Sequence, residues 1–242
     1  MSTPTPHPGP GRHAQVERIE LLGDSVRALH LKVEGQDPFT FLPGQWVALR
    51  FEHEGRFLSR SYSIASPRCS KQRFEVCVKH TGSGAGSHYV WSLQPGDRVE
   101  FSGPSGTFLL REPISRGAIF VANGTGISPF RPMLHRALPH SNGQPITLLL
   151  GTRAQGDLLY GSEWEELEGR YPNFRFLPTL SRPEPGWEGR KGYVQDVTPD
   201  LLNPVKDADV YICGLNPMVD TVRRQCREWG YPDDRVHYER YD

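Results

Sequence analysis

VANGTGISPF, at residues 121–130, passes within ten residues from an apolar strand through a glycine turn into a helical pattern. Ile119–Ala122 is compact and apolar, which is typical of a buried strand. Gly124 and Gly126 allow the backbone to turn tightly and to approach a ligand closely. The helix that follows presents unpaired N–H groups and its positive dipole end, which suit an anion such as a pyrophosphate. Taken alone, the glycine pair is better explained by a tight strand–helix turn, and Pro129 stands where the dinucleotide fingerprint expects a third small residue.

Apolar strands and helical patterns alternate through the rest of the second half of the chain. The helix after the glycine turn carries one apolar stripe, formed by Ile127, Phe130, Leu134 and Leu138. The predicted strands are Ile119–Ala122, Thr147–Leu150, Phe174–Leu177 and Val210–Ile212. This order predicts a parallel sheet wound with helices, in which ligands bind at the carboxyl ends of the strands. Cys213 follows the last strand in CGLNPM (213–218), where it is either a small buried thiol or part of a site.

The first half of the chain follows a different pattern, with short β-type runs broken by glycine, proline and polar turns. The predicted strands are Arg18–Leu22, Val26–Val33, Trp46–Glu52, Arg60–Ala65, Arg73–Lys79 and Arg98–Ser102. No helix stands out between them, and the pattern predicts a closed or nearly closed antiparallel Greek-key β-barrel. The change near Arg111–Gly117 divides the chain into a flexible tail (1–13), a barrel domain (14–111) and an α/β parallel-sheet nucleotide-binding domain (112–242).

Composition argues against several other functions. The 28 basic residues balance the 28 acidic ones, so no overall field favours nucleic acid or an anionic membrane. No apolar run approaches the roughly 20 residues that a membrane-spanning helix needs. Neither zinc nor iron–sulfur spacing is shown by the four cysteines, Cys69, Cys77, Cys213 and Cys226. We therefore expect a cytoplasmic protein with reduced thiols and without a metal, nucleic acid or membrane partner.

Seven motifs, taken together, occur in the order and spacing of a known family. They are RSYSIAS (60–66), CVKH (77–80), GAGSHYV (84–90), GPSG (103–106), GTGISPF (124–130), CGLNPM (213–218) and VHYERY (236–241). The chain thus resembles the ferredoxin–NADP reductase family over nearly its whole length. The resemblance implies a flavin-binding barrel followed by a pyridine-nucleotide domain, with non-covalent FAD and NADP(H) as cofactors.

The resemblance assigns the flavin to the first domain. It implies that Arg60 pairs with the flavin pyrophosphate, that Tyr62 packs on the isoalloxazine or ribityl face, and that Ser63 bonds near flavin N5. The implied FAD-binding set is Arg60, Ser61, Tyr62, Ser63, Val78, Lys79, Gly84, Gly86, Ser87 and Tyr241. Because residues of one parity share a strand face, we expect a bend or bulge to bring Arg60, Tyr62 and Ser63 to one cofactor. Only residues 81–83 separate CVKH from GAGS, where plant-type members carry an adenine-stacking aromatic.

The resemblance also implies a set of catalytic residues. Cys213 matches the cysteine beside the place where the nicotinamide meets the flavin, and Ser63 matches the hydroxyl opposite it. Glu239 and Tyr241 are two residues apart and share a face of an extended strand, as a supporting carboxylate and a flavin-covering aromatic require. Asp242 follows the aromatic, where plant-type members stop, and a carboxylate there would weaken stacking or ease displacement of the ring.

The second domain is implied to bind NADP(H). The implied residues are Gly124, Thr125, Gly126, Pro129, Arg153, Ser181, Arg182, Lys191, Tyr193, Cys213, Gly214 and Met218. Two cations with hydroxyl donors suit a 2′-phosphate, and Arg190 adds a third cation. NADH-using oxygenase reductases show a similar S-R-P…W-x-G…G-x-V stretch, in which Gly189, Gly192 and Val194 are loop scaffold. Arg153 either faces the adenosine or caps a helix.

These assignments predict an oxidoreductase that takes hydride from NADPH onto FAD and passes single electrons to a separate carrier such as ferredoxin or flavodoxin. An acceptor would dock at basic residues near the flavin edge, for which Lys71, Arg73 and Lys79 are candidates. One alternative is an NADH-dependent reductase component of an oxygenase, or a flavin or ferric reductase. Another is a non-catalytic electron-transfer subunit, which would have no use for the four catalytic side chains.

Overall fold

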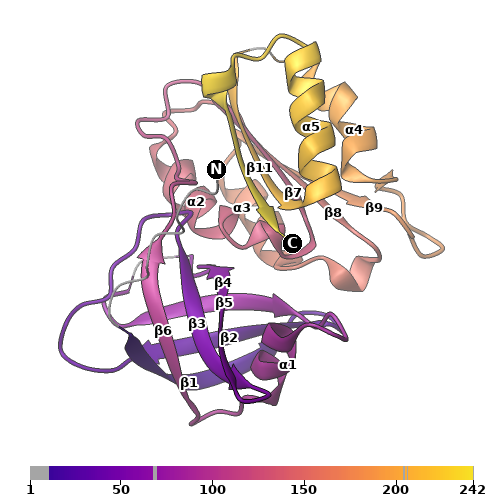
Figure 1. Cartoon of the computed structure of the whole chain (residues 1–242). Helices are drawn as coiled ribbons and strands as arrows, with labels where there is room; N and C mark the ends of the chain where they lie inside the picture. The colour runs from indigo at the N-terminus through magenta and orange to yellow at the C-terminus, as the bar shows by residue number, and fades with distance from the viewer. Residues whose placement is uncertain (1–10, 68–69, 204, 206, 242) are drawn as a thin grey trace, which may run out of the picture.

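The computed structural model describes residues 11–67, 70–203, 205 and 207–241 and has two lobes (Figure 1). The residues expected to form most of the N-terminal tail, together with Cys69 and Asp242, lie outside these ranges. The first lobe contains the strands β1 (Arg12–Leu21), β2 (Val26–Val33), β3 (Trp46–His53), β4 (Arg56–Ser63), β5 (Arg73–Lys79) and β6 (Arg98–Ser105). β1 begins within the expected tail, because Arg12 and His13 already pair with β6.

The first lobe is the predicted antiparallel barrel. Its strand order is β4-β3-β6-β1-β2-β5, and a bridge between Ile64 and Val76 joins the two edges. The bridge makes β4 and β5 neighbours, so β3, β4 and β5 follow one another around the barrel in sequence order. The next strand, β6, lies on the other side of β3, which is the Greek-key arrangement. Buried aromatic side chains fill the interior, among them Phe39, Phe74 and Phe101. Closure leaves little exposed strand edge.

The barrel lobe contains a helix that strand patterning did not reveal. Helix α1 (Ala85–Ser92) lies at the lower right of the barrel in Figure 1. Its buried residues are Gly86, Ser87 and Val90, so it has no continuous apolar stripe. Hydrophobic patterning gave no sign of this helix, because the period that reveals an amphipathic helix is missing here. The motif GAGSHYV (84–90) indicated it, since in the family that the chain resembles this motif begins a helix.

The second lobe is a parallel sheet, as predicted. Its strands are β7 (Gly117–Asn123), β8 (Ile146–Thr152), β9 (Phe174–Leu180), β10 (Arg190–Lys191), β11 (Ala208–Leu215) and β12 (Val236–Tyr241). Their order is β10-β9-β8-β7-β11-β12, and all neighbours are parallel. The chain therefore moves outward from β7 through β8 and β9 and returns to the other side of β7 with β11. The carboxyl ends of β7 and β11 form the switch point at which open α/β sheets bind ligands.

Helices cover both faces of this sheet. Helices α2 (Phe130–Ala137) and α3 (Gly161–Arg170) pack on one face, and α4 (Val194–Leu202) and α5 (Asn216–Glu228) on the other (Figure 1). Successive residues of β7 alternate between the two cores, with Phe120 facing the first and Val121 the second. Among the described residues, no helix has the length and apolar character needed to cross a membrane.

The helix predicted after the glycine turn is interrupted. Residues Gly124–Ile127 form a 3₁₀ turn, α2 follows, and Leu138–His140 form a second 3₁₀ turn. The four residues of the predicted stripe are nevertheless all buried, with Ile127, Phe130 and Leu134 fully inaccessible. Prolines at positions 129 and 139 cannot supply the N–H groups that a continuous helix requires, which accounts for the breaks.

An apolar core joins the two lobes. Ala65 and Cys77 of the barrel belong to the same buried cluster as Phe108 and as Phe130 of α2. The C-terminal strand β12 ends at the junction of the lobes (Figure 1). Residues from both lobes therefore meet beside the switch point.

Candidate active site

The switch point is shaped by close backbone packing. A Cβ on Gly126 would collide with the carbonyl group of Cys213 and lie 2.9 Å from the Cα of Gly214. Gly214 has φ +148°, and its backbone approaches Asn123. The amide of Leu215 donates to Asn123 Oδ1 at 3.0 Å and ties the ends of β7 and β11 together. Only glycine fits at positions 126 and 214 without displacing one of the two strands.

Four side chains from both lobes form one hydrogen-bonded chain beside this turn. The Tyr241 hydroxyl donates to Ser63 Oγ at 2.7 Å, and Ser63 donates to Glu239 Oε2 at 3.1 Å. The Cys213 thiol also hydrogen-bonds with the Tyr241 hydroxyl. Ser63 ends β4 of the barrel, whereas the other three residues come from the neighbouring strands β11 and β12. The structure thus brings together the four residues that the sequence suggested as catalytic.

Burial controls the protonation of this chain. Burial raises the pKa of Glu239 to about 7, although the hydrogen bond from Ser63 opposes the rise. Cys213 is completely inaccessible, and burial raises the pKa of its thiol well above the usual value. Burial likewise raises the pKa of Tyr241 well above its usual range. Near neutral pH the thiol and the phenol stay protonated, and Glu239 is the member of the chain whose pKa lies near 7.

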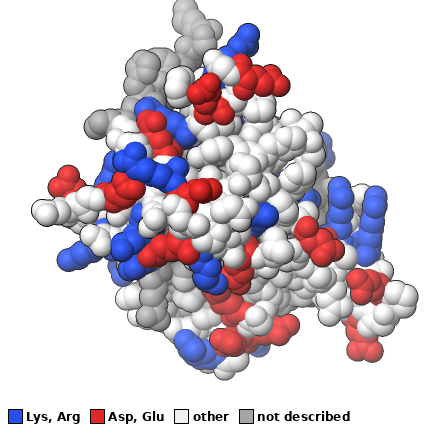
Figure 2. Space-filling view, turned by 90° about the horizontal axis from the view of Figure 1, so that it is seen from below, with Lys and Arg blue, Asp and Glu red and all other residues white. Residues whose placement is uncertain are grey.

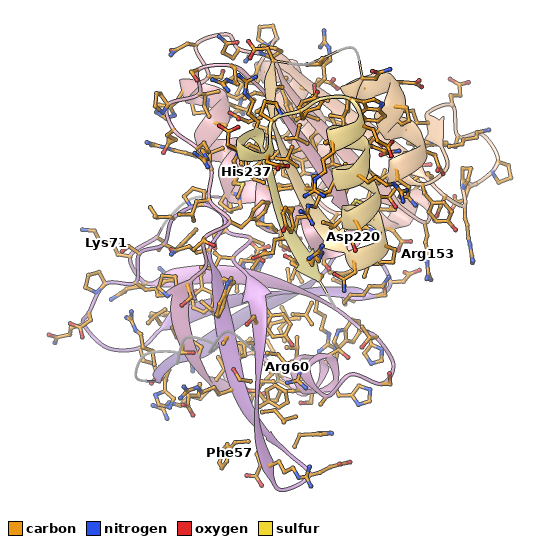
Figure 3. All side chains as sticks on the ribbon, turned by 45° about the horizontal axis from the view of Figure 1, so that its top comes forward. Phe57, Arg60, Lys71, Arg153, Asp220 and His237 are labelled. Carbon is orange, nitrogen blue, oxygen red and sulfur yellow. The ribbon has the colours of Figure 1, made fainter. Side chains whose placement is uncertain are left out.

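Arg60 and Tyr62 form a second part of the site, on the other face of β4. A Cβ on Gly86 would lie 2.5 Å from the Tyr62 hydroxyl and 2.8 Å from Arg60 Cγ, so both side chains rest on the first turn of α1. Figure 3 shows Arg60 beside this helix. Arg60 is exposed, and in the described part of the chain no carboxylate pairs with it. An unpaired guanidinium beside a helix N-terminus is a suitable arrangement for a diphosphate.

The bulge expected in β4 is not there. β4 pairs with β3 in regular register from Trp46↔Ser63 to His53↔Arg56. Ser63 therefore faces the second lobe while Arg60 and Tyr62 face α1. Because successive residues of a strand point to opposite faces, Ser63 and the pair Arg60 and Tyr62 reach different surroundings without a bulge in β4. Burial raises the pKa of Tyr62 to about 12, so its hydroxyl remains protonated.

The other predicted flavin-site residues differ in what they offer a ligand. Val78 is 4% exposed and its side chain belongs to the barrel core, so only its backbone is available, whereas Ser61 and Lys79 are exposed. Gly84 is the N-cap of α1. The Ser87 hydroxyl already donates to the Gly84 carbonyl at 2.9 Å and bonds with Thr81. The Ser87 hydroxyl is therefore hydrogen-bonded within the turn.

The predicted phosphate-binding residues lie at the carboxyl ends of β8, β9 and β10. The Arg182 amide donates to the carbonyl of Arg153 at 2.8 Å, and Lys191 is the register partner of Leu180. The side chains of Arg153, Arg182 and Lys191 are exposed, and they form no ion pair with any described carboxylate. Arg153 is labelled in Figure 3, on the α/β lobe. Ser181 is partly buried with its hydroxyl on Thr152, and Tyr193 is 63% exposed.

The remaining residues of the predicted nucleotide site support the turn in different ways. Gly124 has φ +51° with open space where a Cβ would lie, and Thr125 beside it is partly exposed. Pro129 is the buried N-cap of α2. Met218 is 3% exposed and packs against Gly214, so it supports the backbone turn from within the core.

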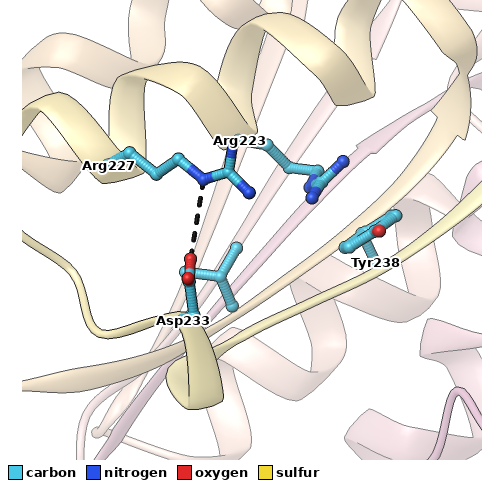
Figure 4. Close-up of a pocket in the computed structure, with 5 residues that line it drawn as sticks. Arg223, Arg227, Asp233 and Tyr238 are labelled. Carbon is cyan, nitrogen blue, oxygen red and sulfur yellow. Dashed lines mark ion pairs between the residues drawn. The ribbon is translucent and has the colours of Figure 1, made fainter.

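Two smaller features lie apart from this site. A cavity of about 100 Å³ between α5 and β12 is lined by Arg223, Arg227, Asp233, Val236 and Tyr238 (Figure 4). Arg227 pairs with Asp233 at 3.5 Å, and the Arg223 guanidinium lies 3.6 Å from the Tyr238 ring, so its polar groups are already engaged. On the face shown in Figure 2, acidic and basic side chains are interspersed, without a field of one sign. Among the described residues, no group of three or more acidic, His or Cys side chains is arranged to hold a metal.

The sequence did not reveal Asn123 or Arg131 as site residues. Asn123 links the two strands of the switch point, and its signal was a polar residue at the carboxyl end of an apolar strand. Arg131 connects the lobes through Glu75 and the Ala65 carbonyl. In the sequence, Arg131 is marked only as a charged residue directly after Phe130, which is an apolar residue of the predicted stripe. Neither signal identifies a partner without the structure.

Similar proteins have the same two-part organisation. Residues 13–109 match the family model of the oxidoreductase FAD-binding domain, and residues 120–224 match that of the oxidoreductase NAD-binding domain. The chain is 38% identical over 237 residues to ferredoxin–NADP reductase B of Sorangium cellulosum, covering 95% of this chain and 97% of that protein. It is 32% identical to the toluate 1,2-dioxygenase electron transfer component of Pseudomonas putida, over 96% of this chain and 68% of that one.

Solved structures agree with the fold. The Amycolatopsis cytochrome P450 reductase GcoB superposes with a TM-score of 0.84 at 25% identity, over 96% of this chain and 69% of that one. A ferredoxin NADP⁺ reductase from Neisseria gonorrhoeae with bound FAD and NADP shares the fold, with a TM-score of 0.81 at 19% identity over 95% and 98% of the two chains. Fold, site and family models define a two-domain oxidoreductase with an FAD-binding barrel and an NAD(P)-binding lobe. Within this class, the chain belongs to the ferredoxin–NADP(H) reductase family.

Proposed function

We propose that this protein is a flavoenzyme that takes hydride from NADPH onto bound FAD and passes single electrons to a separate carrier protein. The observation that carries the proposal is the hydrogen-bonded chain from Cys213 through Tyr241 and Ser63 to Glu239, which crosses from one domain to the other. Such a chain is of use where a ligand of the barrel meets a ligand of the nucleotide turn. A subunit that only stored electrons would not need it. We take residues 14–111 and 112–242 as the two functional units.

The residues fit FAD. Arg60 and the first turn of α1 would hold the diphosphate, with Gly86 providing the close backbone approach that any side chain would block. Bound FAD supplies an acceptor that takes two electrons together and releases them singly. Ser63 would orient the reacting edge, and Glu239, which accepts from the Ser63 hydroxyl, would hold or release a proton beside it. Tyr241 would exclude water from that edge until the nicotinamide enters.

The exposed cations favour NADPH over NADH as the donor. Arg182, Lys191 and Arg153 lie at one edge of the sheet without carboxylate partners among the described residues. A dianionic phosphate would form charge-assisted hydrogen bonds with such groups. The relative named ferredoxin–NADP reductase B, which this chain matches over almost its whole length, supports the same donor.

The acceptor is proposed to be ferredoxin or a flavodoxin-like carrier. Of the three basic residues considered for docking, Arg73 is occupied by a two-pronged pair with Glu17 at 2.8 and 3.0 Å. Lys71 and Lys79 remain exposed. Figure 3 shows Lys71 and Arg153 on opposite sides of the molecule, so a carrier at Lys71 would not compete with the nucleotide phosphate.

One observation favours a second candidate, an NADH-dependent reductase component of an oxygenase. The Trp187 indole donates to the Arg190 carbonyl at 2.9 Å, and Gly189 packs against the Trp187 ring. The loop before Lys191 is therefore ordered by its own contacts, as a scaffold would be. Several relatives are named as oxygenase electron transfer components.

Anaerobic stopped-flow mixing of the FAD-loaded protein with NADPH and, separately, NADH tests both candidates. The proposal predicts rapid loss of flavin absorbance with NADPH and at least tenfold slower loss with NADH at equal subsaturating concentrations. Equal or faster bleaching by NADH would favour the oxygenase-type reductase. Bleaching by neither would contradict both.

A further inference from the structure

Arg131 joins the nucleotide-binding lobe to the barrel. It lies in the first turn of α2, just after the glycine turn, and its side chain is 13% exposed. Nη1 donates to Glu75 Oε2 at 2.9 Å and to the Ala65 carbonyl at 3.2 Å, both in the barrel. Nε and Nη2 donate to Glu163 of α3, in its own lobe, at 2.9 and 2.7 Å. One planar guanidinium therefore holds groups from two domains at once.

The barrel groups that Arg131 holds lie at the seam where the barrel closes. The Ala65 amide donates to the Glu75 carbonyl at 2.8 Å, and Ile64 forms the bridge to Val76. Ser63, which connects Tyr241 to Glu239, is only two residues before Ala65. Arg131 therefore holds the same strand end that carries Ser63.

The cluster around Arg131 is fully partnered. The Tyr160 hydroxyl donates to Glu75 Oε1 at 2.5 Å, and the Arg131 guanidinium lies 3.9 Å from the Tyr160 ring centre. His135 bonds Glu163 at 2.7 Å. Burial alone would raise the pKa of Glu163, but the hydrogen bonds from His135 and Arg131 outweigh it and lower that pKa. The Glu163 carboxylate that anchors Arg131 thus remains charged at neutral pH.

Apolar packing does not complete the interface at this point. A cavity of about 540 Å³ opens between the lobes, with Arg131, Glu75 and Tyr160 in its wall. At the wall of this cavity the polar bonds of Arg131 link the barrel seam to α2, beside the apolar cluster that contains Ala65 and Phe130. The pair of Arg131 with Glu75 is a charge-assisted link between the two lobes, with N···O at 2.9 Å.

We propose that Arg131 is a positioning residue for the reaction, fixing the separation between Ser63 at the barrel seam and the nucleotide turn at Gly124–Ile127. The inference rests on the proposed function. Hydride transfer requires reacting atoms about 3–3.5 Å apart, and a misplacement of about 1 Å costs on the order of 100-fold in rate. Arg131 therefore affects the transfer step more than it affects binding of either ligand.

The test compares Arg131→Lys and Arg131→Met with the matched control Arg136→Met on the exposed face of the same helix. Lysine keeps the charge but is a point donor that cannot bridge Glu75, Ala65 and Glu163 together. The control removes a guanidinium that pairs with Glu112, outside the bonds among Arg131, Glu75, Ala65 and Glu163. Three quantities are measured on FAD-loaded protein: the flavin bleaching rate at saturating NADPH, the Kd for 2′,5′-ADP, and amide hydrogen exchange in residues 63–66.

The proposal predicts at least a tenfold fall in the bleaching rate for Arg131→Lys and a larger fall for Arg131→Met. The Kd for 2′,5′-ADP, which does not reach the barrel, should stay within twofold, while exchange at residues 63–66 becomes faster. Arg136→Met should stay within twofold of wild type throughout. If Arg131→Met does not fold, Arg131→Lys carries the test.

Three results would overturn the proposal. A wild-type bleaching rate in Arg131→Lys would show that the clamp does not control the transfer step. An equal loss in Arg136→Met, or a parallel loss of 2′,5′-ADP affinity, would show a general role in stability. If wild type is bleached by neither nucleotide, the proposed function fails on its own, and unchanged exchange at residues 63–66 in Arg131→Lys would then overturn the clamp separately.

Discussion

Replacing Glu239 by glutamine should change how the stability of the protein depends on pH. Burial raises the pKa of Glu239 from 4.5 to about 7, so the folded protein holds a proton that the unfolded chain releases between these two pH values. The favourable contribution of the protonated carboxyl is fully present below pH 4.5 and is lost as pH rises through about 7. Glutamine resembles the protonated carboxyl and cannot ionise. The variant should therefore gain on wild type as pH rises.

The expected size follows from the two pKa values. A difference of about 2.5 corresponds to about 3 kcal/mol in the free energy of unfolding, most of which appears between about pH 5 and pH 8. Urea unfolding of wild type and Glu239→Gln, at equal FAD content, gives the difference at each pH. Following fluorescence and circular dichroism together checks that the transition is two-state. A difference that stays constant to within about 0.5 kcal/mol from about pH 5 to pH 8 would refute the reasoning.

Two further substitutions test the ligand sites. Arg182→Ala should raise the KM for NADPH at least tenfold, because a charge-assisted hydrogen bond contributes about 1.5–3 kcal/mol. The KM for NADH should stay unchanged. Steady-state kinetics with both nucleotides measure the two constants, and Arg224→Ala, at an exposed arginine, is the control. Gly86→Ala should weaken FAD binding at least tenfold, because the new methyl meets Tyr62 and Arg60, whereas Gly169→Ala in open space should retain FAD and gain up to about 1 kcal/mol of stability. Titration with flavin, followed by fluorescence quenching, measures the affinity for FAD. Wild-type affinity in Gly86→Ala would contradict the expectation for Gly86.

Much of the fold was readable because its elements follow simple periods. Val26–Val33 and Arg73–Lys79 were predicted with the bounds that the structure shows, since each lies between clear turn signals. The parallel sheet was readable from its short apolar strands. Periodicity did not reveal helix α1, because Gly86 and Ser87 occupy its buried face, where an amphipathic pattern requires apolar side chains. Only the motif GAGSHYV indicated a helix there.

The sequence indicated which residues form the candidate site but not how they contact one another. Ordered motifs identified Ser63, Cys213, Glu239 and Tyr241, but their hydrogen bonds depend on the register of β11 with β12 and on how the lobes meet. The expectation of a bulge in β4 failed because it assumed that one face must serve the whole cofactor. Arg131 was not recognised because its barrel partners, Glu75 and Ala65, are 56 and 66 residues away in the sequence.

The central claim is that the chain of side chains joined through Ser63 is where the nicotinamide reacts. The most direct test is the single-turnover rate of flavin bleaching by saturating NADPH in wild type and Ser63→Ala, which removes the hydroxyl that accepts from Tyr241 and donates to Glu239. We predict a fall of about 100-fold or more, with FAD content and 2′,5′-ADP affinity retained, because a preorganised hydrogen-bond donor is lost at the reacting edge. A bleaching rate within twofold of wild type would contradict the account.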